Sequence, residues 1–97
     1  MKLALLLALA GVALACSAAP AAATVPPKTC GYMNAGGHKY KVRAHLVRCK
    51  HARRHTRRIL NGGKGPSGWS CRRFSPSVTR IRFMCDRGAR DFYAIRQ

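Results

Sequence analysis

The stretch that decides the fold of this 97-residue chain is HKYKVRAHLVRCKHARRHTRRIL, residues 38–60. From Tyr40, every second residue of its first part is apolar and basic residues stand between, which is the period of a strand buried on one face. From Cys49 onward the apolar residues recur every three or four positions, as they do along one side of a helix. We therefore predict a strand over 38–47, followed by a helix over 49–60.

The predicted helix divides into an apolar side and a cationic side. The cationic residues fall opposite the apolar ones in a helical projection; they are Lys50, Arg53, Arg54, Arg57 and Arg58. Several are like charges one turn apart, and each such pair costs a few tenths of a kcal/mol, so the helix depends on the packing of its apolar side. Asn61-Gly62-Gly63 marks its C-terminal end, because glycine readily adopts the left-handed backbone found there.

Shorter strands are predicted on both sides of this stretch. The turn Gly36-Gly37 joins it to an earlier strand from Cys30 to Asn34. After the helix, a loop over 64–68 precedes strands over 69–74, 78–85 and 91–96, and in the second of these we expect Ile81, Phe83 and Cys85 on one face. The predicted fold class is α+β: a small disulfide-stapled domain with an N-terminal strand or hairpin, one amphipathic helix and a three-stranded antiparallel meander.

The N-terminal segment has the composition of an export signal. Lys2 precedes an apolar stretch over 3–14, shorter than the roughly 18 to 20 residues that a membrane-spanning helix needs. Ala21-Ala22-Ala23 fits a cleavage site. We expect a signal peptide over 1–23, an extended tether over 24–29 and one domain over 30–97, in a protein that is secreted or extracellular and open to association with the cell envelope.

A second interpretation of this segment is lipid attachment. Cleavage after Ala13-Leu14-Ala15 would leave Cys16 at the new N-terminus, where bacterial lipoproteins carry their lipid. We favour cleavage after Ala23, because it removes Cys16 and leaves an even number of cysteines in an oxidising compartment.

Four cysteines then remain, and they allow three pairings. We prefer Cys30–Cys49 and Cys71–Cys85, because a hairpin brings the members of each pair back together. In the chain-entropy account each bond contributes about 3 kcal/mol, which matters in a domain with so small a core.

The charge of the chain is strongly one-sided. It carries 19 Lys and Arg against two acids, a net charge of +17, and loss of Lys2 with the signal lowers this to +16. The two acids are Asp86, expected in a turn, and Asp91, expected at the start of a strand. A positive field with so little compensation destabilises the compact state through self-repulsion, and an anionic partner relieves it.

Three segments of the chain resemble a known family. They are Val47-Arg48-Cys49-Lys50-His51-Ala52-Arg53, Gly68-Trp69-Ser70-Cys71 and Cys85-Asp86-Arg87-Gly88. Together they resemble a small exported four-cysteine domain that recurs among the secreted proteins of high-GC Gram-positive (actinobacterial) organisms, over about residues 30–95. The resemblance implies the fold and the compartment. The family has no assigned activity, so no site residue follows from it.

Motifs for catalysis or metal binding are weak in this sequence. It contains no Gly-x-Ser-x-Gly nucleophile elbow and no Cys-x-x-Cys pair. His51 and His55 stand one helical turn apart, a metal-ligand spacing, but Arg53 and Arg54 beside them repel a cation. We therefore expect a protein that is not an enzyme and that has neither a cofactor nor a metal site.

Binding to an anionic surface is the function we predict. The helix residues above form one cationic surface, and Arg72, Arg80 and Arg82 on the outer face of the sheet form another. Charge on two faces suits an extended polyanion: an anionic envelope polymer, an anionic lipid surface or, without sequence specificity, nucleic acid. Because aromatic residues do not interleave with the helix cations, the helix does not predict single-strand recognition. We expect a monomer.

Three alternatives remain open. The first is a secreted inhibitor that presents a loop such as 61–68, and the second is an antimicrobial or toxin-like effector. The third is a small secreted ribonuclease, because histidine and basic residues together can cleave phosphodiesters by acid–base catalysis.

Overall fold

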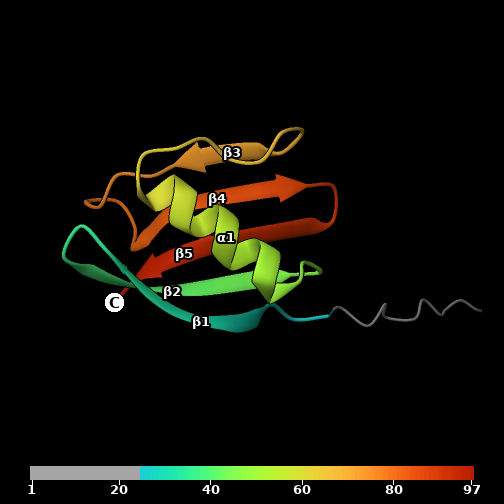
Figure 1. The fold of residues 1–97 in the computed structure, drawn as a ribbon, viewed down its shortest axis with the longest axis horizontal. Helices are drawn as coiled ribbons and strands as arrows, with labels where there is room; N and C mark the ends of the chain where they lie inside the picture. Colours follow the sequence, from blue (N-terminus) through green and yellow to red (C-terminus); the bar gives the residue numbers. More distant parts are fainter. Residues whose placement is uncertain (1–24) are drawn as a thin grey trace, which may run out of the picture.

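The computed structural model describes residues 25–97. The predicted signal peptide, its cleavage site and Cys16 lie outside the described residues. Figure 1 shows the arrangement of the elements in space. In chain order they are β1 (Lys28–Ala35), β2 (His38–His45), α1 (Cys49–Leu60), β3 (Ser70–Arg73), β4 (Ile81–Arg87) and β5 (Arg90–Arg96).

All five strands form one antiparallel sheet in the order β1-β2-β5-β4-β3. The helix α1 lies diagonally across one face of this sheet (Figure 1). The α+β class is therefore confirmed: an N-terminal hairpin, one helix and three further antiparallel strands. Pairing of β2 with β5 joins the hairpin to the three later strands and makes them one sheet.

The core lies between α1 and the face of the sheet that it covers. In the central strands the buried residues alternate as a half-buried strand requires; they are Tyr40, Val42 and Ala44 in β2, Phe83 and Cys85 in β4, and Phe92 and Ala94 in β5. The helix contributes Ala52, Thr56 and Ile59, spaced one turn apart on one side. Within residues 25–97 no helix covers the opposite face of the sheet, and we call it the helix-free face.

Two disulfides tie the outer elements to this core. Cys30 of β1 is bonded to Cys49 at the first position of α1, and Cys71 of β3 is bonded to Cys85 of β4. These are the pairs preferred from the sequence. Cys71 and Cys85 are direct cross-strand partners with Cα atoms 4.0 Å apart, so the second disulfide reinforces the pairing of a four-residue edge strand.

The C-terminal end of α1 follows the Gly signal in the sequence. Gly62 has a φ of 92°, and its N–H donates to Ile59 O while Gly63 N–H donates to Arg58 O. This pair of bonds is the Schellman motif, which satisfies carbonyls that the helix leaves without partners. The helix therefore ends at Leu60, the residue that the prediction gave.

Several strand boundaries differ from the prediction. Leu46 has a φ of 57° and is 50% exposed, so β2 ends at His45 and the apolar alternation stops before Leu46. The chain turns there to leave the sheet and bring Cys49 to Cys30. β1 begins at Lys28, so the last two residues of the predicted tether belong to the first strand.

The start of β4 also differs from the prediction. The strand begins at Ile81, three residues later than expected, and Val78 is 78% exposed outside it. A register shift lies between Ile81, which pairs with Ile95, and Phe83, which pairs with Ala94. Ile81 is only half-buried whereas Phe83 is fully buried, because an irregular step in the strand breaks the simple alternation.

Candidate functional site

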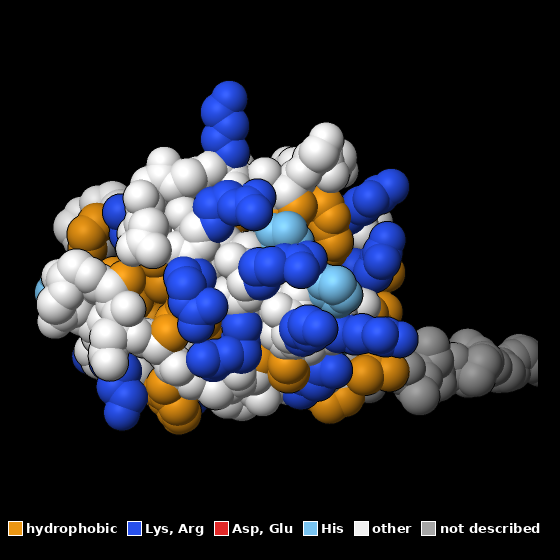
Figure 2. Space-filling view, viewed as in Figure 1, with side chains coloured by type: hydrophobic (Ala, Val, Ile, Leu, Met, Phe, Trp, Pro, Cys, Tyr) orange, Lys and Arg blue, Asp and Glu red, His pale blue; other side chains and the backbone are white. Residues whose placement is uncertain are grey.

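The cationic residues of α1 lie on its side away from the sheet. Lys50, Arg54, Arg57 and Arg58 are exposed, and Arg53 is half-buried. We call these five residues the helix stripe. Figure 2 shows Lys and Arg side chains spread over the helix-bearing face, with no acidic side chain in view.

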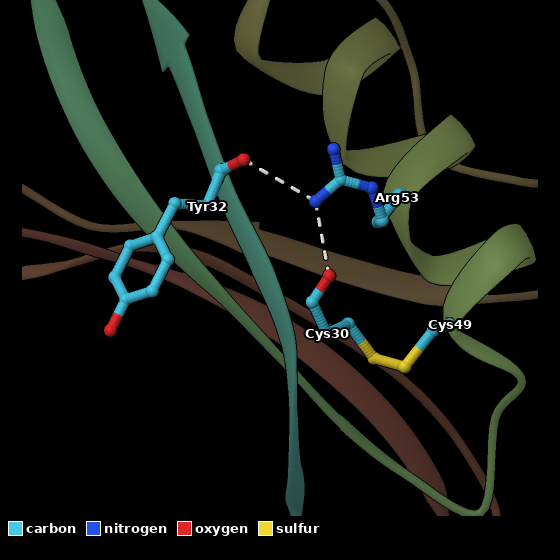
Figure 3. The surroundings of a disulfide bond; sticks show 4 residues. All are labelled: Cys30, Tyr32, Cys49 and Arg53. Carbon is cyan, nitrogen blue, oxygen red and sulfur yellow. Dashed lines mark hydrogen bonds between the residues drawn. A yellow bond between two sulfur atoms is a disulfide. The ribbon is translucent and has the colours of Figure 1, made fainter.

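Arg53 differs from the rest of the helix stripe because its guanidinium is engaged. Its Nη1 donates to Cys30 O at 3.0 Å and to Tyr32 O at 3.3 Å, next to the Cys30–Cys49 disulfide (Figure 3). Between these carbonyls lies Gly31, with a φ of 100°. A Cβ at Gly31 would stand 2.7 Å from Arg53 Nη1. Arg53 therefore fastens the helix to a bulge in β1, which leaves four stripe residues exposed to a partner.

The structure places the three sheet arginines of the prediction in two settings. Arg72 pairs with Met84 on the helix-free face, and its guanidinium carbon lies 5.7 Å from the centroid of the Phe74 ring. Arg80 and Arg82 instead join Arg96 around a cavity of about 340 Å³ next to Leu60, at the C-terminal end of α1.

Aromatic and cationic side chains do interleave, but on the helix-free face rather than along the helix. Tyr32 pairs with Lys41, and Arg43 pairs with Tyr93. Lys39 Nζ lies 5.0 Å from the centroid of the Tyr32 ring. These aromatic residues do not stand beside the helix cations in the sequence, so the composition of the helix alone does not reveal this set. The basic residues that alternate with apolar ones over 38–45 are the sequence signal for this set on the helix-free face.

The two acids of the chain meet at one end of the helix-free face. Asp86 and Asp91 are cross-strand partners next to the β4–β5 turn. His45 Nδ1 lies 3.8 Å from Asp91 Oδ2 and donates to Ala89 O at 2.9 Å. Asp86 thus belongs to β4 and Asp91 to β5, and strand alternation directs both away from the helix.

His51 and His55, one turn apart on α1, line a cavity of about 430 Å³ at its N-terminal half. The cavity is also lined by Arg48 before the helix, Trp69 before β3 and Arg90 of β5. We call this group the histidine pocket. The spacing of the two histidines suggests only metal ligation, whereas Trp69 and Arg90 reach them from distant segments and are not visible as neighbours in the sequence.

The surroundings of His55 disfavour its charged form. Burial lowers the pKa of His55 below its ordinary value, and the positive charges of Arg54, Arg58 and His51 lower it further. Its ring lies 6.1 Å from that of Phe92. Among residues 25–97 no group forms a hydrogen bond with the buried Nδ1 of His55, and no cluster of three or more His, Cys, Asp or Glu there is arranged to hold a metal ion.

No helix within residues 25–97 is long and apolar enough to cross a membrane. As to its relationship with other proteins, the structure shows only a small domain with two disulfides. No family model, no curated protein and no solved structure matches the chain.

Proposed function

We propose that this chain is a secreted, strongly basic binding module without catalytic activity, which adheres to an anionic polymer of the cell envelope or to an anionic membrane surface. The observation that carries the proposal is that both acidic residues lie on the face opposite the helix. The helix stripe covers one face, whereas Asp86 and Asp91 sit together on the other.

This arrangement gives the helix face a positive field that no carboxylate on that face weakens. Four stripe residues, Lys50, Arg54, Arg57 and Arg58, are exposed along the 12 residues of α1. Such a row of exposed cations suits a flexible polymer with repeated negative charges, because each contact releases counterions and needs no exact geometry. A partner of this kind also relieves the self-repulsion of a chain that carries 19 basic residues and two acids.

Secretion is supported by two independent features. A small domain with two disulfides is consistent with an oxidising, extracellular location. The likeness of three segments to an exported four-cysteine domain of actinobacteria supports the same compartment and names no activity.

The experiment is a charge reversal of the helix stripe. We expect the R54E/R58E variant to lose most of its retention on immobilised polyphosphate and on envelope fractions. Each lost phosphate contact flattens the slope of log affinity against log salt by somewhat under one unit. Stability should stay nearly unchanged, because positions 54 and 58 still carry like charges one turn apart, whereas Lys50 gains an opposite charge one turn away.

A matched control changes the net charge by the same amount on the helix-free face. The K39E/R72E variant reverses two exposed cations there, and we expect it to keep most of the retention. Equal losses in the two variants would show that net charge alone drives adhesion. Retention of R54E/R58E with the wild-type salt slope would refute a role for the helix face, and salt-insensitive binding to a single protein would favour the inhibitor alternative.

A further inference from the structure

The histidine pocket differs from the helix stripe because it is concave. Residues from three separate segments surround it: Arg48 with the histidines of α1, Trp69, and Arg90. Its volume of about 430 Å³ lies in the range of cavities that hold small ligands. Arginine, histidine and aromatic side chains line it, and no carboxylate does.

The two arginines of the pocket have no carboxylate partner among residues 25–97, where the one acidic contact is made by His45. The Arg90 guanidinium carbon instead lies 5.8 Å from the centroid of the Trp69 ring, a contact of the cation–π type that positions the group and leaves its N–H donors available. Arg48 is exposed, and its side chain does not cap α1. Both guanidiniums can therefore donate to an anion in the cavity.

The histidines add a further donor in a defined tautomer. Arg54 Nη2 donates to His51 Nδ1 at 3.0 Å. Since arginine cannot accept a hydrogen bond, His51 Nδ1 must be the acceptor, and the proton of the neutral ring is on Nε2. His51 thus presents an N–H donor whether the ring is neutral or charged. The N-terminal end of α1 also favours an anion, because its first turn has no acidic residue and the helix dipole is positive there.

We propose that the histidine pocket binds the phosphate group of a phosphate ester. This inference rests on the proposed function and narrows it, because the polyanion recognised is then a phosphate polymer and not a carboxylate one. A tetrahedral phosphate offers acceptors in several directions, which matches donors that come from Arg48, His51 and Arg90. A planar carboxylate has two oxygens, which a single guanidinium can satisfy.

The test is a titration of the oxidised, secreted protein with glycerol 3-phosphate, followed by NMR of the ring signals of His51, His55 and Trp69. High, constant ionic strength screens adhesion to the exposed stripe. We expect saturable shifts at all three rings and a rise in the pKa of His55 on binding. Inorganic phosphate tests recognition of the phosphate group alone, and acetate tests recognition of any anion.

Variants make the assignment specific. The R48Q/R90Q variant should bind glycerol 3-phosphate at least tenfold more weakly, and the K39Q/R72Q variant should bind it like the wild type. The single R48Q variant changes only an exposed side chain, so it keeps the test decisive if the double variant folds poorly. Absence of saturable shifts in the wild type, equal binding of acetate, or equal weakening in both double variants would overturn the proposal.

A comparison of inorganic phosphate with glycerol 3-phosphate distinguishes a site for free phosphate from a site for a phosphate ester. Equal affinity for inorganic phosphate and glycerol 3-phosphate supports a site for the phosphate group alone, and tighter binding of the ester supports contact with the organic part. The adhesion proposal fails in a different measurement. If retention on polyphosphate depends on the helix stripe but the titration is flat, only the pocket proposal is wrong. If the titration saturates but retention does not depend on the helix stripe, adhesion by the helix face is wrong.

Discussion

Gly65 stands where the loop after α1 passes over the Cys71–Cys85 disulfide. A Cβ at this position would overlap Cys71 Sγ and lie 3.4 Å from Cys85 Sγ. Both sulfurs are fixed by their bond, so the loop backbone has to move instead. We expect Gly65→Ala to destabilise the fold by about 1–3 kcal/mol, the usual cost of overpacking, measured by thermal or denaturant unfolding.

Gly36 provides the comparison for Gly65. It lies in the β1–β2 turn with a φ of 57°, and a Cβ there would meet nothing within 4 Å. Gly36→Ala should cost only the backbone strain of about 1 kcal/mol. A Gly65→Ala variant that is more stable than Gly36→Ala would contradict this, because it would show that the loop backbone over the disulfide moves without a large loss of stability.

His55 makes stability depend on pH. Burial and the charges of Arg54, Arg58 and His51 lower its pKa in the folded state below the ordinary 6.5. Between these two values the unfolded chain binds more protons, so the free energy of unfolding falls as the pH drops through 6.5 and the loss is complete below the folded pKa. We expect His55→Gln to remove this part of the pH dependence, which lies between pH 6.5 and the lowered pKa of the folded state.

The measurement for His55 is the midpoint of denaturant unfolding at a series of pH values. The slope against pH is the quantity to compare, because His55→Gln also alters packing against Phe92 and shifts the curve as a whole. A variant with the wild-type slope would contradict the assignment of this dependence to His55.

At the scale of elements, β3 depends most on a covalent bond. It has four residues, all exposed, and it pairs with β4 alone at the edge of the sheet. We expect the Cys71→Ser/Cys85→Ser variant to lose about 3 kcal/mol and to be largely unfolded at 37 °C, because the small core cannot compensate. Thermal unfolding followed by circular dichroism measures this, and a cooperative transition at the wild-type temperature would refute it.

The helix is an element that its own sequence does not hold together. Its cationic pairs repel one another, and its N-terminus has neither a side-chain cap nor an acidic residue in the first turn. Three contacts compensate: the buried side of Ala52, Thr56 and Ile59, the Cys30–Cys49 bond, and the hydrogen bonds of Arg53 to β1. Packing therefore lets the helix display charges that would unfold it in isolation.

At the scale of the whole molecule, β2–β5 pairing makes one folding unit of two sequence halves. Six residue pairs connect these strands, and α1 packs across β1, β2 and β5. We expect a single unfolding transition, with Trp69 fluorescence and the loss of hydrogen-exchange protection in β1 and β2 coinciding. Earlier unfolding of the N-terminal hairpin, with Trp69 still in its native environment, would contradict this.

The same topology gives the molecule two unlike faces. One carries the helix stripe, and the other carries interleaved aromatic and cationic side chains together with both acids. If the helix face is the adhesive one, the protein is oriented on a polymer with its helix-free face outward.

The sequence by itself determined the parts of this protein that depend on neighbours along the chain. Period two and period 3.6 located β2 and α1, and Gly62 ended the helix, because backbone geometry imposes those periods and that conformation locally. The favoured cysteine pairs followed in the same way, since a hairpin or a strand-to-helix turn brings each pair together. The cationic character of the exposed side of α1 was also readable, because an apolar stripe leaves only one side for the charges.

Only the tertiary structure decided what depends on residues far apart in the chain. The pairing of β2 with β5 joins segments about 50 residues apart, and several strand pairings satisfy the same alternation equally well. That pairing places His45 beside Asp91 on the helix-free face, and the packing of α1 brings His51 and His55 to Trp69 and Arg90. The packing of α1 also brings Arg53 within hydrogen-bond distance of backbone carbonyls of β1. These juxtapositions arise from the global packing of side chains, which local periodicity does not encode.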